Sequence, residues 1–497
     1  MTRRGNRPSP EDPLAPYGLG GPTTCATLAK HARERPDAPA AAMGTRVVSY
    51  QALTADTLRL LHLLRQSGLC PPQVLGVAVG DRYRHMTVLL AAEALGLTTV
   101  SLGADELLPP ASLGRLCDRV AVDAILPGPD PARQLIIPMS PPDHASGAGL
   151  EALQRPAEPD AVVRLIKSSG TTGLPKVMRV THRIQEQTLA NNLLYAASVL
   201  PRPHFLCLYG FGVRGAHSRV LLTLRAGGTV HFIADEAIGP VLAAGLGNYV
   251  LFVTGDLERF MRSAPVPVQR PDLVLDVIGA ALSPRLRTEV QARLTDRVVA
   301  TYGTNETHHI SLVGDDNVGR LFPGVQVRVT DDAGNAVAPG ETGLIWLRTP
   351  AMTDGYVDAP ELTRGAFVDG WYRTDDAGYQ PSPETLVVLG RQDGMLNIGG
   401  VKISPEPVVA ELKSVPGVED AFVMSLGDSV ESGALLVALQ LAEGVAATQV
   451  RAPVDAIVRR LVRFYHLLPT RALPRTGTGK VIPDAVRALY RETASRL

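Results

Sequence analysis

Cysteine, net charge and long apolar runs are what this sequence has least of. Its 497 residues hold four cysteines, far apart and without a Cys-x-x-Cys pair. Neither a disulfide framework nor a cysteine-rich zinc site is therefore expected, and the predicted compartment is reducing and cytoplasmic. Lysine plus arginine and aspartate plus glutamate both number 49, which argues against bulk binding of nucleic acid or of an anionic membrane. Any anion that the protein binds must be held by a local site.

No segment is long and apolar enough to predict a membrane span. The most apolar stretch, residues 88–97, is short and is interrupted by Glu93. Residues 1–20 carry prolines and arginines but no apolar core, so they predict a flexible tail and not a signal peptide. The composition is globular, with 45% hydrophobic and 20% charged residues, and the length allows roughly three domain-sized units.

Strand and helix signals alternate along the chain, which favours a parallel α/β sheet. Helical spacing over 50–68 ends at Gly68, a buried strand is predicted over 74–79, and helical spacing returns over 88–97. Residues 126–160 are rich in Pro, Gly and Ala and predict a linker or long loop. The alternating pattern over 325–347, with a turn at 331–335, predicts an antiparallel hairpin.

A smaller unit is predicted from about Gly390 onwards, with a strand at 402–403, a helix from about Pro405, strands near 421–424 and 435–441, and a final helix. The predicted fold class is therefore α/β. It has a large N-terminal domain of layered sheets with helices and a small, mobile α+β C-terminal domain.

The strongest local signal is the Gly-, Ser- and Thr-rich segment 167–176, which follows the mainly apolar run 162–166. Small residues let backbone N–H groups approach an anion closely, hydroxyls add donors, and Lys176 adds positive charge. The spacing does not match the Walker loop. The segment predicts a cradle for phosphate groups.

Residues 168–176 resemble the phosphate loop of the adenylate-forming superfamily, which includes acyl-CoA synthetases, adenylation domains of nonribosomal peptide synthetases and beetle luciferases. Four further motifs follow in the family's order, at 301–306, 370–376, 390–393 and 474–480. The resemblance implies ATP-dependent activation of a carboxylic acid as an acyl-adenylate, with release of pyrophosphate. Transfer to coenzyme A, or to the phosphopantetheine of a carrier protein supplied in trans, would follow.

The resemblance also assigns roles to residues. Lys480 would contact the carboxylate and the α-phosphate as a catalytic residue, and Glu306, the second catalytic residue, would bind Mg²⁺ together with Thr172. Asp376 would hold the ribose hydroxyls, with Arg391 near the ribose. The other residues expected to bind ATP or AMP are Ser168, Ser169, Gly170, Thr171, Gly173, Lys176, Gly279, Ala280, Ala281, Tyr302, Gly303, Thr304 and Asn305.

The expected domains are an N-terminal AMP-binding domain over 21–390, a hinge over 391–393 with Asp393 as its pivot, and a C-terminal domain over 394–497 that carries Lys480. In the resembling family the small domain rotates after adenylation. The same movement is the hypothesis for this chain, with a rigid interdomain linker as the alternative. Two departures from the family pattern are Asn305, where threonine is usual, and Asp375, where glycine is usual.

The expected acyl pocket comprises Phe211, Gly212, Arg214 and His308. Arg214 falls at about the place where amino-acid-activating members carry an aspartate for the substrate ammonium. An arginine there would repel an α-ammonium group, which disfavours a standard α-amino acid. Arg214, His217 and Arg219 raise the hypothesis of a substrate with a second acidic or polar group, and the alternative is solvent-facing charge at a helix start.

Three alternatives stay open at this point. The acceptor could be an amine or another non-thiol nucleophile. The chain could be a non-catalytic nucleotide-binding relative, although Lys176, Glu306, Asp376 and Lys480 are all present. Residues 210–215 match the Gly-x-Gly-x-x-Gly fingerprint of a nicotinamide-dependent oxidoreductase, with Asp235 about 20 residues on. That last interpretation leaves the five ordered motifs unexplained.

Overall fold

The structure is a computed structural model, and the chain divides into two compact units. Unit 1 comprises Met1–Gln326 and Leu347–Tyr372, and unit 2 comprises Val327–Trp346 and Arg373–Leu497. The described residues are 23–102, 122–126, 149–156, 158–168, 175–196, 199, 202–263, 269–392, 396–398, 401–403, 405–426, 435–462, 465–475 and 481–494. Most of the loop predicted over 126–160 and the tail over 1–20 lie outside them.

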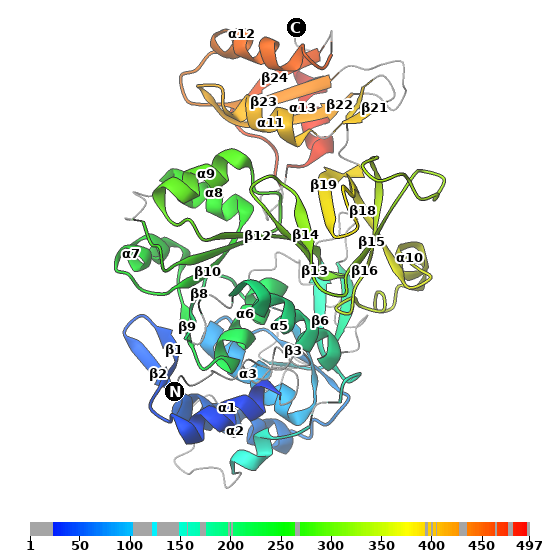
Figure 1. The fold of residues 1–497 in the computed structure, drawn as a ribbon. Coiled ribbons are helices and arrows are strands. Elements are labelled where there is room, and N and C mark those ends of the chain that lie inside the picture. The colour runs from blue at the N-terminus through cyan, green and yellow to red at the C-terminus, as the bar shows by residue number, and fades with distance from the viewer. Residues whose placement is uncertain are drawn as a thin grey trace, which may run out of the picture. The chain divides into compact units, whose positions relative to one another are not determined.

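Unit 1 contains a five-stranded sheet in the order β5-β3-β4-β6-β7, of which Figure 1 labels β3 and β6. Its first four strands are parallel, and β7 runs antiparallel to β6, with Ser168 opposite Lys176 in the register. The two ends of the predicted phosphate loop are therefore paired with each other. The strands are β3 (Val74–Val77), β4 (Thr98–Ser101), β5 (Val122–Leu126), β6 (Val162–Ser168) and β7 (Lys176–Thr181).

A second sheet of unit 1 has the order β14-β13-β12-β11-β10-β8-β9-β1-β2. The strands from β12 to β1 are parallel, and the pairs at the two ends are antiparallel. The strands are β1 (Pro39–Met43), β2 (Arg46–Ser49), β8 (His204–Cys207), β9 (Thr229–Phe232), β10 (Tyr249–Val253), β11 (Val274–Ile278), β12 (Val298–Thr304), β13 (His308–Val313) and β14 (Gly319–Leu321).

The helices of unit 1 begin at side chains that cap their free N–H groups. Thr23, Ser49, Asp81 and Ser283 accept hydrogen bonds from the backbone two or three residues inside the helices that follow them. The helices are α1 (Thr24–Glu34), α2 (Tyr50–Gln66), α3 (Arg82–Leu95), α5 (His182–Ala196), α6 (Arg214–Arg225), α7 (Ile238–Ala243), α8 (Thr254–Ser263), α9 (Pro284–Arg293) and α10 (Pro360–Ala366).

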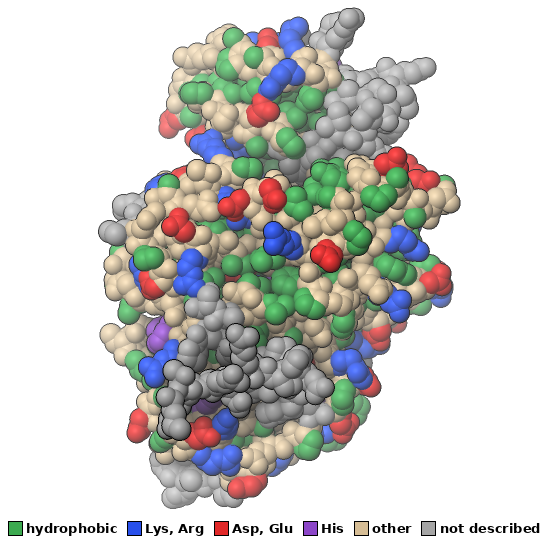
Figure 2. Space-filling view, viewed as in Figure 1, with side chains coloured by type: hydrophobic (Ala, Val, Ile, Leu, Met, Phe, Trp, Pro, Cys, Tyr) green, Lys and Arg blue, Asp and Glu red, His purple; other side chains and the backbone are tan. Residues whose placement is uncertain are grey.

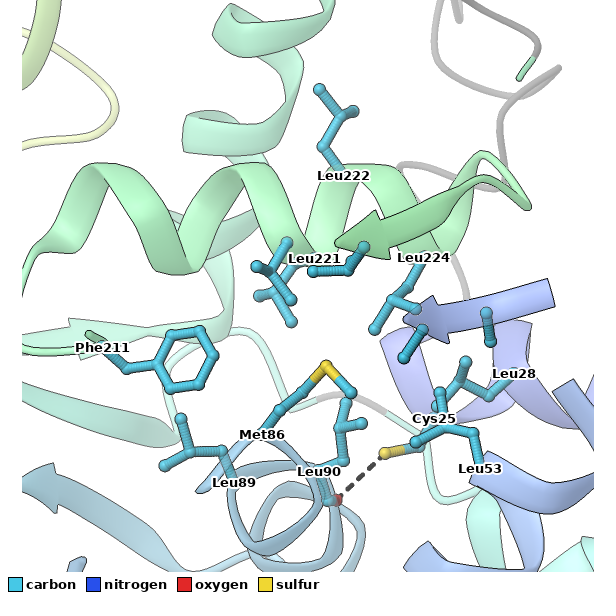
Figure 3. Packing of buried hydrophobic residues seen from close by; sticks show 14 of the residues in the cluster. Cys25, Leu28, Leu53, Met86, Leu89, Leu90, Phe211, Leu221, Leu222 and Leu224 are labelled. Atoms are coloured by element: carbon cyan, nitrogen blue, oxygen red, sulfur yellow. Dashed lines mark hydrogen bonds between the residues drawn. The ribbon is translucent and has the colours of Figure 1, made fainter. Parts of the chain in front are cut away.

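The main core of unit 1 fixes α6 in place. In Figure 3, Leu221 of α6 faces Met86 of α3, Leu89 of α3 lies beside Phe211, and Cys25 of α1 donates a 3.1 Å hydrogen bond to the carbonyl of Leu90. Burying several such side chains stabilises the packing by about 1.5–3 kcal/mol each. The start of α6, where the predicted acyl-site residues lie, is therefore anchored by the core.

The strands of unit 2 are neighbours in the order β15-β16-β18-β19. Strand β17 pairs with Trp371 and Tyr372, the first two residues of β18, which belong to unit 1. The neighbours β15 and β16 match the hairpin predicted over 325–347. The strands are β15 (Gln326–Thr330), β16 (Gly343–Arg348), β17 (Phe367–Val368), β18 (Trp371–Tyr379) and β19 (Thr385–Arg391).

The C-terminal part of unit 2 is the predicted α+β arrangement. A three-stranded sheet, β22-β23-β24, packs with α11 and α12 around a core of valines and leucines. The elements are β20 (Leu396–Ile398), β21 (Val401–Ile403), α11 (Glu406–Lys413), β22 (Val418–Ser425), β23 (Leu435–Leu441), α12 (Ala447–Val458), β24 (Tyr465–Thr470) and α13 (Pro483–Ala494).

The described surface mixes charges of both signs. On the face in Figure 2, Lys and Arg side chains are interspersed with Asp and Glu, as the equal numbers of acidic and basic residues suggest. Within the described part of the chain, none of the helices has the length and apolarity needed to cross a bilayer.

Candidate active site

The predicted phosphate loop is framed by β6 and β7. Its residues 169–174, and so Ser169, Gly170, Thr171, Thr172 and Gly173, lie outside the described residues, whereas the backbone of Ser168 and the whole of Lys176 are described. The ammonium of Lys176 lies 5.0 Å from the centre of the Tyr356 ring. An ammonium over an aromatic ring is attracted by the negative face of that ring. The position of the Lys176 ammonium is therefore stabilised by Tyr356, which belongs to none of the predicted motifs.

Glu306 lies in the turn between β12 and β13 and is only 6% exposed. Its Oε1 accepts a 2.9 Å hydrogen bond from the hydroxyl of Tyr356, and its main-chain oxygen accepts one of 2.8 Å from the amide of Thr353. Within the turn, the Thr304 hydroxyl accepts a 3.2 Å bond from the amide of Thr307. These bonds fix both the backbone and the carboxylate of Glu306.

Tyr356 is the site residue that sequence reasoning missed. It is 4% exposed, forms a bridge with Met178 of β7, and precedes Val357, whose amide donates 2.8 Å to the Val177 carbonyl. A lone tyrosine carries no pattern of its own. The local signal is Gly355, whose φ of 140° suits glycine, shortly before a Pro-initiated helix. Through Tyr356 the structure brings two predicted residues together, Lys176 and Glu306.

The predicted adenine-side residues lie at one edge of the second sheet. Gly279, Ala280 and Ala281 directly follow β11, and Tyr302 to Asn305 end β12. Val277 is paired with Ala300 in the parallel register, so Gly279 lies beside Tyr302 two residues further along. The Thr254 hydroxyl donates 2.7 Å to the carbonyl of Ala280 and holds the first of these loops. Carboxyl ends of parallel strands are where α/β sheets bind ligands.

The Glu306 turn contains a close backbone approach and one strained residue. The register between β12 and β13 shifts at Gly303, and a Cβ on Gly303 would overlap the carbonyl oxygen of His308. His308 itself has a φ of 59°, a left-handed conformation that is uncommon for residues other than glycine. Strain of this kind costs about 1–3 kcal/mol and clusters at ligand sites.

Two of the predicted acyl-site residues, Arg214 and His308, border the same turn. Arg214 begins α6, and its Nη1 donates to the main-chain oxygen of Asn305, next to Glu306, while its Nη2 lies 3.4 Å from the Thr188 hydroxyl. The His308 ring contacts the His309 ring edge to face at 4.0 Å. Phe211 is buried, and Gly212 is exposed.

Burial dominates the electrostatics of these side chains. It lowers the pKa of Arg214 to about 10, against the opposing effect of the nearby Glu306 carboxylate. Burial, reinforced by the neighbouring His309 and Arg214, lowers the pKa of His308 well below its usual value. His308 is therefore neutral near pH 7, and Arg214 is charged.

Arg219 is occupied by a buried network, not by solvent. It forms a 2.8 Å ion pair with Asp276, both side chains being fully buried, and its Nη2 donates 2.7 Å to the Tyr195 hydroxyl. That hydroxyl lies 3.1 Å from Nε2 of His309, and Tyr249 donates 2.9 Å to Asp276. Through the Tyr195 hydroxyl the network contacts His309. The charge of Arg219 is already compensated by Asp276, so Arg219 is not expected to bind a substrate anion.

Packing explains the last glycine of the 210–215 fingerprint. Strand β8 precedes them and α6 follows, as the dinucleotide fingerprint requires. A Cβ on Gly215, however, would lie 2.8 Å from Cδ1 of Ile278, so glycine allows α6 to pack closely on β11. The side chain at the helix start is Arg214, which contacts the Glu306 turn.

The predicted ribose residues belong to unit 2. Asp376 and Arg391 are paired across β18 and β19, and Arg391 also forms a 3.1 Å ion pair with Asp375. Asp375 is one of the departures from the family pattern. Lys480 and Asp393 lie outside the described residues. Arg475 and Val481, on either side of Lys480, form a β-bridge, and Arg475 is ion-paired with Asp420.

A protein-family model described as AMP-binding enzyme matches residues 28–357, more than half of the chain. The chain belongs to the AMP-binding enzyme family. It is thereby a member of the adenylate-forming superfamily, and the matched residues include Lys176, Glu306, Arg214 and Tyr356.

Curated relatives extend over nearly the whole chain. The 2-hydroxy-7-methoxy-5-methyl-1-naphthoate–CoA ligase of Streptomyces carzinostaticus is 27% identical, over 97% of this chain and 96% of that protein. The fatty acid–[acyl-carrier-protein] ligase MmaC of Mycobacterium marinum is 28% identical, over 94% and 97%. These relatives support classing the chain as a ligase of the acyl-CoA synthetase type.

Two solved structures share the fold. ATP-bound MatB from Rhodopseudomonas palustris superimposes with a TM-score of 0.79 at 20% identity, over 94% of this chain and 99% of that one. The amide bond synthetase McbA from Marinactinospora thermotolerans gives 0.75 at 21% identity, over 94% and 99%. The predicted α/β fold class is confirmed by this likeness.

Proposed function

We propose that this protein activates a carboxylic acid with ATP as an acyl-adenylate and then transfers the acyl group to the thiol of coenzyme A or of a carrier-protein phosphopantetheine. The observation that carries the proposal is the row Lys176, Tyr356, Glu306. A cation from the phosphate-loop end lies over the ring of Tyr356, and a buried carboxylate accepts a hydrogen bond from the hydroxyl of the same tyrosine. Phosphoryl chemistry needs both charges at one place, because catalysis there is mostly positioning and electrostatic stabilisation.

In the first step a carboxylate oxygen of the acid attacks the α-phosphorus, and the bond to the β-phosphate oxygen breaks. Pyrophosphate leaves with the bonding electrons, and the mixed anhydride remains. Lys176 neutralises part of the charge that accumulates on the departing phosphates. Lys480 is assigned the contact with the attacking carboxylate, and Asp376 the ribose hydroxyls. In the second step a thiolate attacks the acyl carbon, and AMP leaves.

The residues around Glu306 fit a magnesium ion. Mg²⁺ is typically held by one or two protein carboxylates together with substrate phosphates and water. Among the described residues, no group of three or more His, Cys, Asp and Glu side chains forms a dedicated metal cage. Tyr356 binds one oxygen of Glu306, which orients the carboxylate toward a ligand. The ion, when bound there, would offset the charge of the phosphates during adenylation.

The acceptor is the least constrained part of the proposal. The names of the two curated relatives refer to coenzyme A in one case and to an acyl-carrier protein in the other. The fold neighbour McbA is an amide bond synthetase, so an amine acceptor is the competing assignment. Both assignments share the adenylation step.

Acid-dependent exchange between ATP and radiolabelled pyrophosphate tests the adenylation step. The panel comprises aryl, fatty, dicarboxylic, amino and amino-aryl acids, each with Mg²⁺. Exchange should occur with one acid class and should be lost in Glu306→Gln. Absence of exchange with every acid, in a protein that still binds ATP by calorimetry, would overturn the proposal.

Product analysis with coenzyme A, a phosphopantetheinylated carrier protein and an amine tests the acceptor. A thioester should form with one of the two thiols. Amide formation without thioester formation would replace the thiol assignment by the amine one, while leaving the adenylation step in place.

A further inference from the structure

Helix α6 carries three arginines, and two of them have acidic partners. Arg219 is paired with Asp276 at 2.8 Å, and Arg225 forms two hydrogen bonds with the carboxylate of Glu186. Among the described residues, no carboxylate lies within the 4.0 Å ion-pair distance of Arg214. Two neutral acceptors, the Asn305 carbonyl and the Thr188 hydroxyl, are its hydrogen-bond partners. A largely enclosed guanidinium is normally matched by an anion.

The side chains near Arg214 are predominantly basic. His217 lies one turn further along the same face of α6, and the charged groups that act on it are Arg164, His85 and Arg214. His308 and His309 lie on the other side, at the start of β13. His308 is 6% exposed, and its Nδ1 has no hydrogen-bond partner in the described structure. The cluster therefore offers a positive charge and an unused ring nitrogen to a ligand.

Glu306 is the acidic group that acts on Arg214, and it is the same carboxylate that the proposed function assigns to Mg²⁺. Once that carboxylate is shared with a divalent cation, the charge on Arg214 has still less compensation. An anion from the substrate can supply it. A guanidinium forms two parallel hydrogen bonds with a carboxylate, which makes it a geometrically specific receptor for that group.

The location of Arg214 limits the length of such a substrate. Its Nη1 contacts the main chain of Asn305, the residue before Glu306. The reacting carboxylate must approach the phosphates, and these would lie near Glu306 if that carboxylate holds their magnesium ion. A second anionic group bound by Arg214 is therefore only a few bonds from the first.

We propose that Arg214 binds the second carboxylate of the substrate, so that the protein activates short dicarboxylic acids. This inference rests on the proposed adenylation function. It identifies Arg214 as the specificity-determining residue and gives a reason why, in the described part of the chain, no carboxylate lies within ion-pair distance of this arginine beside the Glu306 turn.

The test compares succinate and glutarate with their monomethyl esters in pyrophosphate exchange. The esters keep the reacting carboxylate and the chain length, and they lose only the second charge. Exchange should be about 10- to 100-fold faster, as kcat/KM, with the diacid, since a hydrogen bond to a charged group is worth that factor. Arg214→Met should abolish this preference and leave the KM for ATP unchanged, and Arg214→Lys should restore part of it.

Arg320 supplies the matched control, because it is an exposed arginine on β14, and Arg320→Met should leave the preference intact. Thermal unfolding of each variant checks that the fold is preserved. Equal exchange with diacids and monoesters, or an equal loss on both in Arg214→Met, would overturn the inference while the adenylation function stands. In that case Arg214 only ties α6 to the Glu306 turn.

Calorimetric titration of succinate and glutarate into the protein with ATP absent gives a readout independent of turnover. Binding that is lost in Arg214→Met supports the second-carboxylate site, even if exchange fails and the proposed function is wrong. Binding that is absent, or unchanged by Arg214→Met, contradicts the site whatever the exchange assay shows.

Discussion

At the scale of single residues, Tyr356 shows how one hydroxyl links two motifs. Tyr356→Phe removes the O–H that donates to Glu306 and keeps the ring beside Lys176. We expect adenylation to fall about 10- to 100-fold, because a hydrogen bond to a charged group is lost. The magnesium concentration for half-maximal exchange should rise as well, since the carboxylate is no longer oriented.

Exchange rates measured across a magnesium series check this expectation. Tyr379→Phe is the matched control, because no hydrogen bond of its hydroxyl is seen in the described structure. An unaltered magnesium dependence in Tyr356→Phe would show that the bond to Glu306 has no part in binding the cation.

A second prediction at this scale concerns Glu93, which lies in α3 beside Cys25 and Arg225. Burial raises its pKa above the usual glutamate value, with Arg225 acting in the opposite direction. A carboxyl whose pKa is raised on folding contributes stability below its unfolded pKa, and this contribution is lost as pH rises through the folded pKa. The ionised form is therefore a cost near neutral pH.

Glu93→Gln keeps the shape and removes that cost. The gain in melting temperature over the native chain should be larger at pH 8 than at pH 5, as measured by calorimetry or circular dichroism. A change of the same size at both pH values, or a loss that grows with pH, would mean that ionised Glu93 is stabilised by its neighbours.

At the scale of elements, periodicity located the helices, and capping decided where they begin and end. The helix predicted over 50–68 is α2, which begins after the cap Ser49 and ends at Gln66, just before Gly68 with a φ of 82°. The helix predicted over 88–97 begins earlier, at Arg82, because Asp81 caps it. The spacing of apolar residues does not reveal this first turn, because it contains Arg82 and Arg84.

Asp375 offers a prediction about a pair of neighbouring strands. It lies in β18 and pairs at 3.1 Å with Arg391 of β19, the residue assigned to the ribose. Asp375→Gly, the family-like residue, should release Arg391 and lower the KM for ATP by up to about 5-fold, since exposed ion pairs contribute about 0–1 kcal/mol.

A double-mutant cycle isolates this effect. In an Arg391→Met background, Asp375→Gly should leave the KM for ATP unaffected, because there is no guanidinium to release. If the glycine changes the KM to the same degree in both backgrounds, its effect comes from backbone flexibility and not from the ion pair.

At the scale of the whole molecule, motifs identify residues that are close in sequence, and folding decides which motifs meet. The phosphate-loop end and the Glu306 motif are joined by a tyrosine 50 residues beyond Glu306. Arg214 of α6 donates a hydrogen bond to the main-chain oxygen of Asn305, which follows β12 and lies 91 residues away in the sequence. No periodicity or spacing encodes such encounters, because they depend on the order in which the strands enter the sheets. The residues of 169–174 and Lys480 remain predictions.

The division of labour between the two half-reactions is the prediction that involves the whole chain. Lys480 lies between Arg475 and Val481, which form a bridge, and Arg475 is held by Asp420. If a rotating C-terminal domain brings Lys480 to the site for adenylation alone, Lys480→Ala should slow adenylation by orders of magnitude and largely spare thioester formation from a supplied acyl-adenylate.

Asp420→Asn should reproduce this pattern more weakly, because Arg475, five residues before Lys480 in the sequence, loses its ion pair. Single-turnover assays of each step measure the two rates separately. Equal loss in both steps would refute domain rotation, because a residue that leaves the site between steps cannot serve both.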